Sequence, residues 1–74
     1  MEANDGPLGI LKLALEANVE VTLRDSDVIY GKLKSFDEHL NILLTNAQEN
    51  SHNHDILFIR GDLVKLIRPS VYIA

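Results

Sequence analysis

The period of the apolar residues changes at Val19, and this change most restricts what the chain can fold into. From there, Val19, Val21 and Leu23 alternate with polar residues, which predicts a strand with one buried face and one wet face. Turn residues separate four further apolar segments. The strands predicted in this way cover about 19–24, 28–36, 40–49, 56–59 and 63–67. Gly31 lies inside the second strand, where glycine often marks a bulge or bend, so the pattern favours a small closed or nearly closed barrel, SH3-like or OB-like.

The segment before these strands has a helical period. Asp5-Gly6-Pro7 is a helix-start signal, because aspartate or glycine can cap a helix and proline suits its first position. Leu8, Leu11 and Leu15 then recur on one helical face. We predict a short amphipathic helix over about 7–16 whose leucine stripe covers the barrel core.

The size of the chain limits its stability. Its 74 residues form at most one domain, and so small a domain buries only about 60% of its unfolded surface. Disulfides, a metal or oligomerisation usually add the missing stability. There is no cysteine, which excludes disulfides and a thiolate metal site, whereas 46% of the residues are hydrophobic. We therefore expect the chain to oligomerise.

The charge of the chain narrows its function. A net charge of −4 and a pI of about 5.1 disfavour a protein that grips duplex DNA through phosphates. They still allow the reading of unpaired bases, where stacking supplies much of the binding energy. No apolar stretch reaches the ~18 residues of a membrane span, and the polar, acidic residues 1–5 do not form a signal peptide. We expect no membrane partner and a nuclear or cytoplasmic location.

Two groups of residues resemble the two motifs of the Sm and Sm-like (Lsm) family. The first group is Gly31-x-Leu33-x-x-Phe36-Asp37-x-His39-x-Asn41-x-x-Leu44, and the second is Leu57-Phe58-Ile59-Arg60-Gly61-Asp62-x-Val64. The upstream strand and the helix also fall where the family has them. The resemblance covers about residues 7–68. It implies a single Sm domain over 1–74, with the first motif at about 19–49 and the second at about 54–68.

The resemblance also implies a fold and an assembly. The expected fold is mainly β: a short N-terminal α-helix precedes a strongly bent five-stranded antiparallel sheet that forms a small open barrel, the SH3-like barrel of the Sm fold. The edges of the fourth and fifth strands would pair with other Sm-like subunits in a hetero-heptameric ring, and an isolated chain could form a homo-oligomer. The expected interface consists of Ile56, Leu57, Phe58 and Ile59 on one subunit and Leu63, Val64, Leu66 and Ile67 on the next.

Within the family, the chain is most similar to the third Lsm paralogue, on the strings His39-Leu40-Asn41 and Leu57 to Asp62. This similarity implies a ring subunit that binds uridine-rich single-stranded RNA. Its settings would be pre-mRNA splicing, at the 3′ oligouridine end of U6 snRNA, and mRNA decapping and decay, in the nucleus, the cytoplasm or both. The alternatives are a core D-type Sm protein of spliceosomal particles and a subunit that is mainly a scaffold. No cofactor is implied.

The candidate RNA site lies at two turns, 37–41 and 60–62, which the resemblance places side by side. His39 supplies a ring and Arg60 a planar guanidinium, and a base could stack between them. Asn41 offers a carbonyl acceptor and an amide donor. These two groups match the carbonyl and the N–H of a uracil edge.

Three further residues complete the candidate site. Main-chain groups at Gly61 and Asp62 could bind the same base edge, and Gly61 lets the backbone approach closely because it has no side chain. Asp37 and Asp62 are expected to orient the turns, since carboxylates repel phosphates. The alternative is purely structural: Asp37 and Asn41 shape a turn, and Arg60 pairs with an aspartate.

Catalysis and metal binding are both disfavoured. Asp37 beside His39 could form a general-base dyad, but the chain has no cysteine nucleophile and Ser35 lies in a strand pattern. His52-Asn53-His54-Asp55 lies in a segment, 50–55, that we predict to be a solvated polar loop, and structural zinc sites normally show four ligands at set spacing. We expect no catalytic residue, no metal and no enzyme activity.

Overall fold

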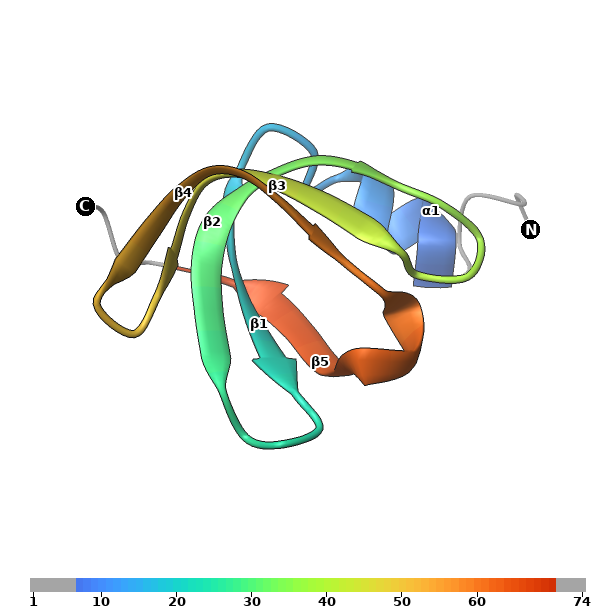
Figure 1. The fold of residues 1–74 in the computed structure, drawn as a ribbon. Coiled ribbons are helices and arrows are strands. Elements are labelled where there is room, and N and C mark those ends of the chain that lie inside the picture. Colours follow the sequence, from blue (N-terminus) through green and yellow to red (C-terminus); the bar gives the residue numbers. More distant parts are fainter. Residues whose placement is uncertain (1–6, 71–74) are drawn as a thin grey trace.

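The computed structural model describes residues 7–70. Three side chains at the start of this range lie outside the description: Pro7, Leu8 and Ile10. The described residues begin with the short helix α1, Pro7–Lys12, and continue into a five-stranded antiparallel sheet (Figure 1). The mainly β fold predicted from the sequence is confirmed.

The helix is shorter than the predicted span of 7–16, and the cause is tertiary. The N–H of Ala14 donates to the carbonyl of Leu11 at 2.9 Å, which is the tighter spacing of a helix end. Glu16 then adopts a φ of 67°. Its N–H donates to the carbonyl of Leu33 at 2.7 Å, so the backbone leaves the helix to join the sheet.

The strands follow the helix in order. Their bounds are β1 Asn18–Leu23, β2 Val28–Phe36, β3 Ile42–Glu49, β4 His52–Ile59 and β5 Val64–Pro69, with a 3₁₀ turn, η2, at Gly61–Leu63. The alternating residues of β1 bury one face of the strand, as predicted, and those of β2 do the same.

Three strand boundaries differ from the prediction by two residues or more, and one of them is the end of β5, which runs to Pro69 rather than residue 67. The third strand begins at Ile42, because Leu40 has a φ of 62° and belongs to a turn. In the segment 50–55, which was predicted to be a loop, only residues 50 and 51 form a turn, because β4 begins at His52 and pairs with β3, with His52 opposite Glu49. Polar residues can form this strand because it lies at the edge of the sheet, where most of its side chains stay exposed.

The sheet must curl, because a short connection joins its two edges. The strand order is β4-β3-β2-β1-β5, so β4 and β5 are the outermost strands. In a flat sheet they would lie about 19 Å apart, four spacings of about 4.8 Å. Only residues 60–63 connect them, three of them in a 3₁₀ turn that rises about 2 Å per residue. The sheet therefore bends round toward a barrel, while β4 and β5 do not pair with each other within the described residues (Figure 1).

The inside of the curled sheet is an apolar core. Its buried members are Val19, Val21, Ile29, Leu33, Ile42, Leu44, Ala47, Ile59 and Val64. The bend that Gly31 was predicted to mark is confirmed: the pairing of β2 with β3 shifts register there, and a Cβ on Gly31 would lie only 3.2 Å from the Cα of Ala47.

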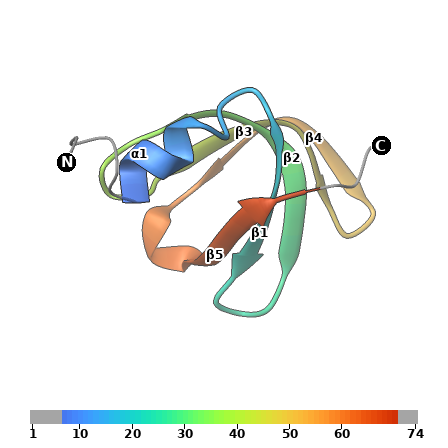
Figure 2. The same ribbon diagram turned by 180° about the vertical axis from the view of Figure 1, so that it is seen from behind.

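The predicted leucine stripe of the helix contributes to this core only in part. Leu11 and Ala14 pack against it, whereas Leu15 is 38% exposed. Leu8 lies outside the described side chains. Figure 2 shows α1 beside the turn that joins β2 to β3.

Candidate nucleic-acid interface

The turn between β2 and β3 is built around the carboxylate of Asp37. Its Oδ1 accepts hydrogen bonds from the backbone N–H groups of His39 at 2.9 Å and Asn41 at 3.0 Å. Its Oδ2 accepts a third from Nδ2 of Asn41 at 3.0 Å. The carbonyl of Asp37 accepts from the N–H of Leu40 at 3.0 Å. An aspartate side chain that accepts a hydrogen bond from the backbone N–H two residues ahead forms an Asx turn. The Asx turn at Asp37 fixes the backbone positions of His39 and Asn41.

These bonds affect the ionisation of Asp37. The hydrogen bond from the Asn41 side chain is the largest cause that lowers the pKa of Asp37 below its ordinary value of 3.8. Desolvation, the second-largest cause, raises the pKa of Asp37 and opposes this effect, whereas the backbone hydrogen bonds from Asn41 and His39 lower the pKa further. At neutral pH the carboxylate is therefore ionised and available as an acceptor.

The second turn runs from Arg60 through η2. Nη2 of Arg60 donates to Oδ2 of Asp62 at 2.8 Å, and both side chains are mostly exposed. An exposed ion pair stabilises a fold by only about 0–1 kcal/mol. The pair orients the Arg60 guanidinium through the edge of the group and not through its flat faces.

A single hydrogen bond joins the two turns. The backbone N–H of Gly61 donates to Oδ1 of Asn41 at 2.7 Å. The approach is so close that a Cβ on Gly61 would lie 1.8 Å from the carbonyl oxygen of His39. Only glycine fits here, and the reason is space rather than conformation, since no glycine in the described residues has a positive φ.

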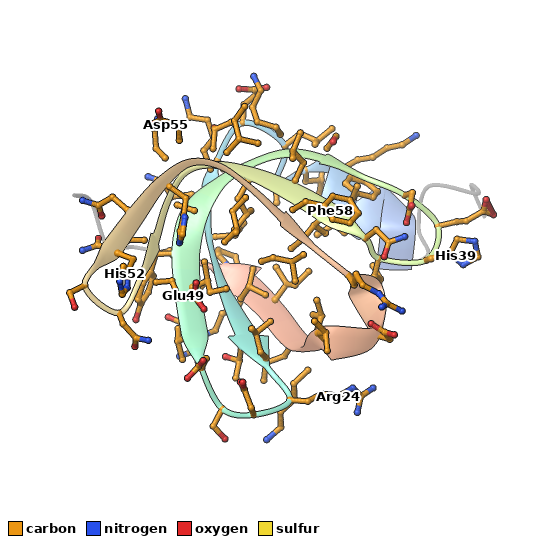
Figure 3. The ribbon with its side chains drawn as sticks, viewed as in Figure 1. Arg24, His39, Glu49, His52, Asp55 and Phe58 are labelled. Carbon is orange, nitrogen blue, oxygen red and sulfur yellow. The ribbon has the colours of Figure 1, made fainter. Side chains whose placement is uncertain are left out.

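The structure thus brings the six predicted site residues into one cluster, formed by Asp37, His39, Asn41, Arg60, Gly61 and Asp62. His39 is exposed and projects away from the sheet at the end of the β2–β3 turn (Figure 3). The ion pair between Arg60 and Asp62 that the structural alternative anticipated is present.

The hydrogen-bonding capacity of the cluster differs from the expectation. The Gly61 N–H is already used by Asn41, and the Asp62 carbonyl accepts from Nε of Arg24 at 2.8 Å. These two main-chain groups are therefore engaged before any ligand arrives. Asn41 keeps one amide N–H and one carbonyl lone pair beyond its bonds to Asp37 and Gly61.

Arg24 was not among the predicted site residues. It follows β1 and lies 38 positions before Asp62. The one signal in the sequence is a basic residue at the end of a strand. Only the pairing of β1 with β5, which brings Leu23 opposite Val64, places it beside η2.

Of the apolar residues predicted to contact other subunits, Ile59 and Val64 are instead buried in the core, because they lie on the inner face of the curled sheet, whereas others on the two edge strands are exposed. On β4, Ile56 is 67% exposed and Phe58 is 61% exposed. Near β5, Leu63 and Leu66 are also exposed. Exposed apolar side chains along an unpaired strand edge are a template for another chain.

His52 of β4 lies on the opposite side of the molecule from His39 and the β2–β3 turn (Figure 3). Nε2 of His54 is buried, lies 3.5 Å from Oε1 of Glu49 on β3 and has no hydrogen-bond partner among the described residues. In residues 7–70 there is no group of three or more histidine, cysteine, aspartate or glutamate side chains that could hold a metal. No helix in this range is long and apolar enough to cross a membrane.

Comparison with known proteins identifies the family. Residues 10–69 match the family model described as the LSM domain. The chain belongs to the LSM domain family. This confirms the predicted Sm-like membership, and because the family is not enzymatic it also confirms that the chain is not an enzyme.

Individual relatives agree with this assignment. A probable U6 snRNA-associated Sm-like protein of Encephalitozoon cuniculi is 33% identical over 85% of this chain and 90% of its own length. The LSM complex subunit lsm3 of Schizosaccharomyces pombe is also 33% identical, over 85% of this chain and 87% of its own length. An lsm3 protein is therefore among the relatives, in keeping with the resemblance to the third paralogue.

Solved structures share the LSM fold at high similarity. A Pyrococcus abyssii Sm protein, solved in complex with a uridine heptamer, gives a TM-score of 0.85 at 30% identity, over 89% of this chain and 100% of that one. The P. aerophilum SmAP1 heptamer gives a TM-score of 0.82 at 37% identity, over 86% of this chain and 92% of that one.

Proposed function

We propose that this LSM chain is a ring subunit that binds uridine-rich single-stranded RNA at the cluster formed by its two turns. One observation carries the proposal: the 2.7 Å bond from Gly61 to Asn41 locks a flat guanidinium and an exposed imidazole ring onto one rigid frame. Single-strand readers stack bases on such groups and bond to the base edge. The Pyrococcus abyssii protein solved with a uridine heptamer has the same fold, which supports this choice of ligand.

Stacking supplies affinity in this proposal. His39 and Arg60 lie on the two turns that Asn41 and Gly61 join, and both side chains are exposed. A base between them would gain about 1–3 kcal/mol. Every base has a flat face, so this contribution does not select uridine.

Selectivity comes from Asn41. After its bonds to Asp37 and Gly61, its amide retains one donor and one acceptor. A uracil edge presents an N–H beside a carbonyl and satisfies both. A base whose edge does not match leaves a polar group unpaired, which costs about 1–3 kcal/mol.

We propose that the edges of β4 and β5 assemble the ring. A contact between two different edges is head-to-tail, so it must close into a ring or continue as a filament. Closure at seven subunits is supported by the likeness to the P. aerophilum SmAP1 heptamer. The natural ring would be a hetero-heptamer of Sm-like subunits, and the isolated chain would form a homo-oligomer.

The cellular role we propose is that of the third Lsm paralogue. It would hold the 3′ oligouridine end of U6 snRNA in splicing in the nucleus, take part in mRNA decapping and decay in the cytoplasm, or both. The relatives named U6 snRNA-associated and lsm3 support this role over a D-type Sm protein. Co-purification from the chain's own cells, with identification of bound subunits and RNA, tests it. Recovery with D-type partners alone would contradict it.

Fluorescence anisotropy with purified rings tests the RNA site. Wild-type rings should bind labelled oligouridine more tightly than oligoadenine. Arg60→Ala should weaken both by about 1–3 kcal/mol, because stacking is lost for any base. Asn41→Ala should chiefly narrow the gap between the two RNAs.

The matched control is Asn53→Ala. It removes an exposed amide from the β3–β4 hairpin, which lies on the opposite side of the molecule from the β2–β3 turn (Figure 1). Equal binding of both RNAs by wild-type rings, or a uridine preference unchanged by Asn41→Ala, would refute the site. Rings that assemble normally but bind no RNA would favour the scaffold alternative.

A further inference from the structure

We propose that Arg24 binds an RNA phosphate beside the base-binding cluster. The inference rests on the proposed function and adds a residue that the two sequence motifs do not contain. Arg24 is exposed and directly follows β1. Its Nε donates to the main-chain carbonyl of Asp62 at 2.8 Å, and the side chain of Asp62 holds Arg60 at the same distance. The two arginines are thus fixed on either side of one residue.

The bond to Asp62 orients Arg24 for an anion. A guanidinium has five N–H donors in a rigid fork that matches phosphate. Arg24 uses one of them, on Nε, and the four on its two Nη groups have no recorded partner in residues 7–70. Because Nε is anchored, the fork is already held in place, and little side-chain entropy remains to be lost when a phosphate binds.

Arg24 differs from three other basic side chains in that its partner carries no charge. Lys34 pairs with Glu16, Arg60 with Asp62 and Arg68 with Glu20. Arg24 instead bonds to an uncharged carbonyl, so no carboxylate offsets its charge in this way.

Three acidic residues lie near Arg24: Asp62, whose carboxylate pairs with Arg60, and Asp25 and Asp27 on the turn after β1. Asp25 follows Arg24, and Oδ1 of Asp25 accepts the backbone N–H of Asp27 at 3.0 Å, which commits that carboxylate to its own turn.

Hydrogen bonds connect the turn of His39 and Asn41 to Gly61, and the neighbouring Asp62 to Arg24, so a strand whose base stacks at His39 can continue past Arg60 toward Arg24 (Figure 3). Phosphate contacts set affinity and register but carry no base information.

The test is the salt dependence of RNA binding by rings of Arg24→Gln. For single strands, each neutralised phosphate contributes about −0.7 to the slope of log K against log salt. The slope should therefore flatten by about 0.7 per phosphate contacted, so that raising the salt fourfold weakens Arg24→Gln about 2.6-fold less than wild type. Binding of oligouridine and oligoadenine should fall by the same factor, leaving the uridine preference unchanged.

Two companion variants make the result decisive. Arg24→Lys keeps the charge but loses the fork and should retain the wild-type slope. Lys32→Gln removes the same charge at the opposite end of β1, where Lys32 pairs with Asn18, and should leave the slope unchanged. Light scattering on each variant confirms that the ring is intact.

Three outcomes would overturn the inference. The first is a slope of log K against log salt that is unchanged in Arg24→Gln. The second is a flattening in Lys32→Gln as large as that in Arg24→Gln. The third is an unchanged slope together with an altered uridine preference in Arg24→Gln, which would mean that Arg24 only positions the Asp62 turn. Failure of the proposed function looks different, because wild-type rings would then bind neither RNA or would not distinguish them.

Discussion

Asn41 and Gly61 show how the site depends on single atoms. The amide oxygen of Asn41 accepts from the Gly61 backbone, and the missing side chain of Gly61 lets the turns meet. Asp37 then fixes Asn41 from the other side. These hydrogen bonds hold the two turns of the candidate site in one arrangement. A single substitution can remove each of them.

Gly61→Ala should disrupt both turns. The new Cβ would meet the His39 carbonyl at 1.8 Å, so one turn must move. Overpacking of this kind costs about 1–3 kcal/mol, and the displacement should also weaken oligouridine binding. Urea unfolding and anisotropy measure the two effects. Gly31→Ala is the comparison: it crowds the core near Ala47 and should lower stability with little effect on RNA affinity. Equal RNA binding by Gly61→Ala and wild type would contradict the close approach.

Asp37 should make the protein sensitive to acid. Its pKa is lowered in the folded state, so its contribution to stability is full above the unfolded pKa, near 3.8, and is lost as the pH falls through the lower folded value. Asp37→Asn should therefore be less stable than wild type at neutral pH, with a difference that shrinks below about pH 4. Urea unfolding across this range measures it. A difference that stays constant with pH would show that the charge of Asp37 does not matter.

At the scale of elements, the boundaries are set by pairing. The helix ends at Lys12 because Glu16 bonds to Leu33 of β2, and β4 starts at His52 because β3 extends to Glu49 opposite it. The helix α1 contributes to the stability of the fold by packing against the barrel core. A helix this short has little stability alone.

Leu11, near the end of α1, and Leu13, just after it, allow the effect of core packing on stability to be measured against an exposed control. Leu11 packs on the core, whereas Leu13 is 84% exposed. Because Leu11 is only half-buried, Leu11→Ala should lower the unfolding free energy by about 1–2 kcal/mol, less than for a fully buried leucine. Leu13→Ala should have little effect. Thermal unfolding followed by circular dichroism compares them, and anisotropy should show the same uridine preference in both. Equal melting temperatures would mean that α1 does not stabilise the barrel.

At the scale of the whole molecule, the curled sheet presents two unpaired edges at once. The η2 connection draws β4 and β5 toward each other, yet the sheet order leaves each strand with one open side in residues 7–70. Exposed apolar residues follow both edges. An 8.3 kDa chain gains buried surface when such edges meet in neighbouring copies.

Phe58→Glu should therefore break the oligomer. The side chain is exposed on β4, so the substitution should place a charge in the subunit interface without disturbing the core (Figure 3). Light scattering should show a ring for wild type and a shift toward a monomer of 8.3 kDa for Phe58→Glu. Leu13→Glu, which charges an equally apolar but distant residue, should leave the ring intact. A stable wild-type monomer at micromolar concentration would contradict the assembly.

The sequence by itself determined the class of fold and which six residues meet at the two turns of the candidate site. Alternation from Val19 and the bend at Gly31 are local properties, because side-chain direction in a strand follows from position alone. The motif residues from Asp37 to Asn41 and from Arg60 to Asp62 were identified by their resemblance to the family. This resemblance also predicted that the two turns lie side by side.

Tertiary structure alone decided which groups are engaged. That Gly61 donates to Asn41, 20 positions away, and Arg24 to the Asp62 carbonyl, 38 positions away, follows from strand pairing across the curled sheet. Local periodicity carries no information about such partners. The same pairing ended the helix early and turned a polar segment into an edge strand, because hydrogen bonds between distant backbone groups outweigh the weak preferences of short segments.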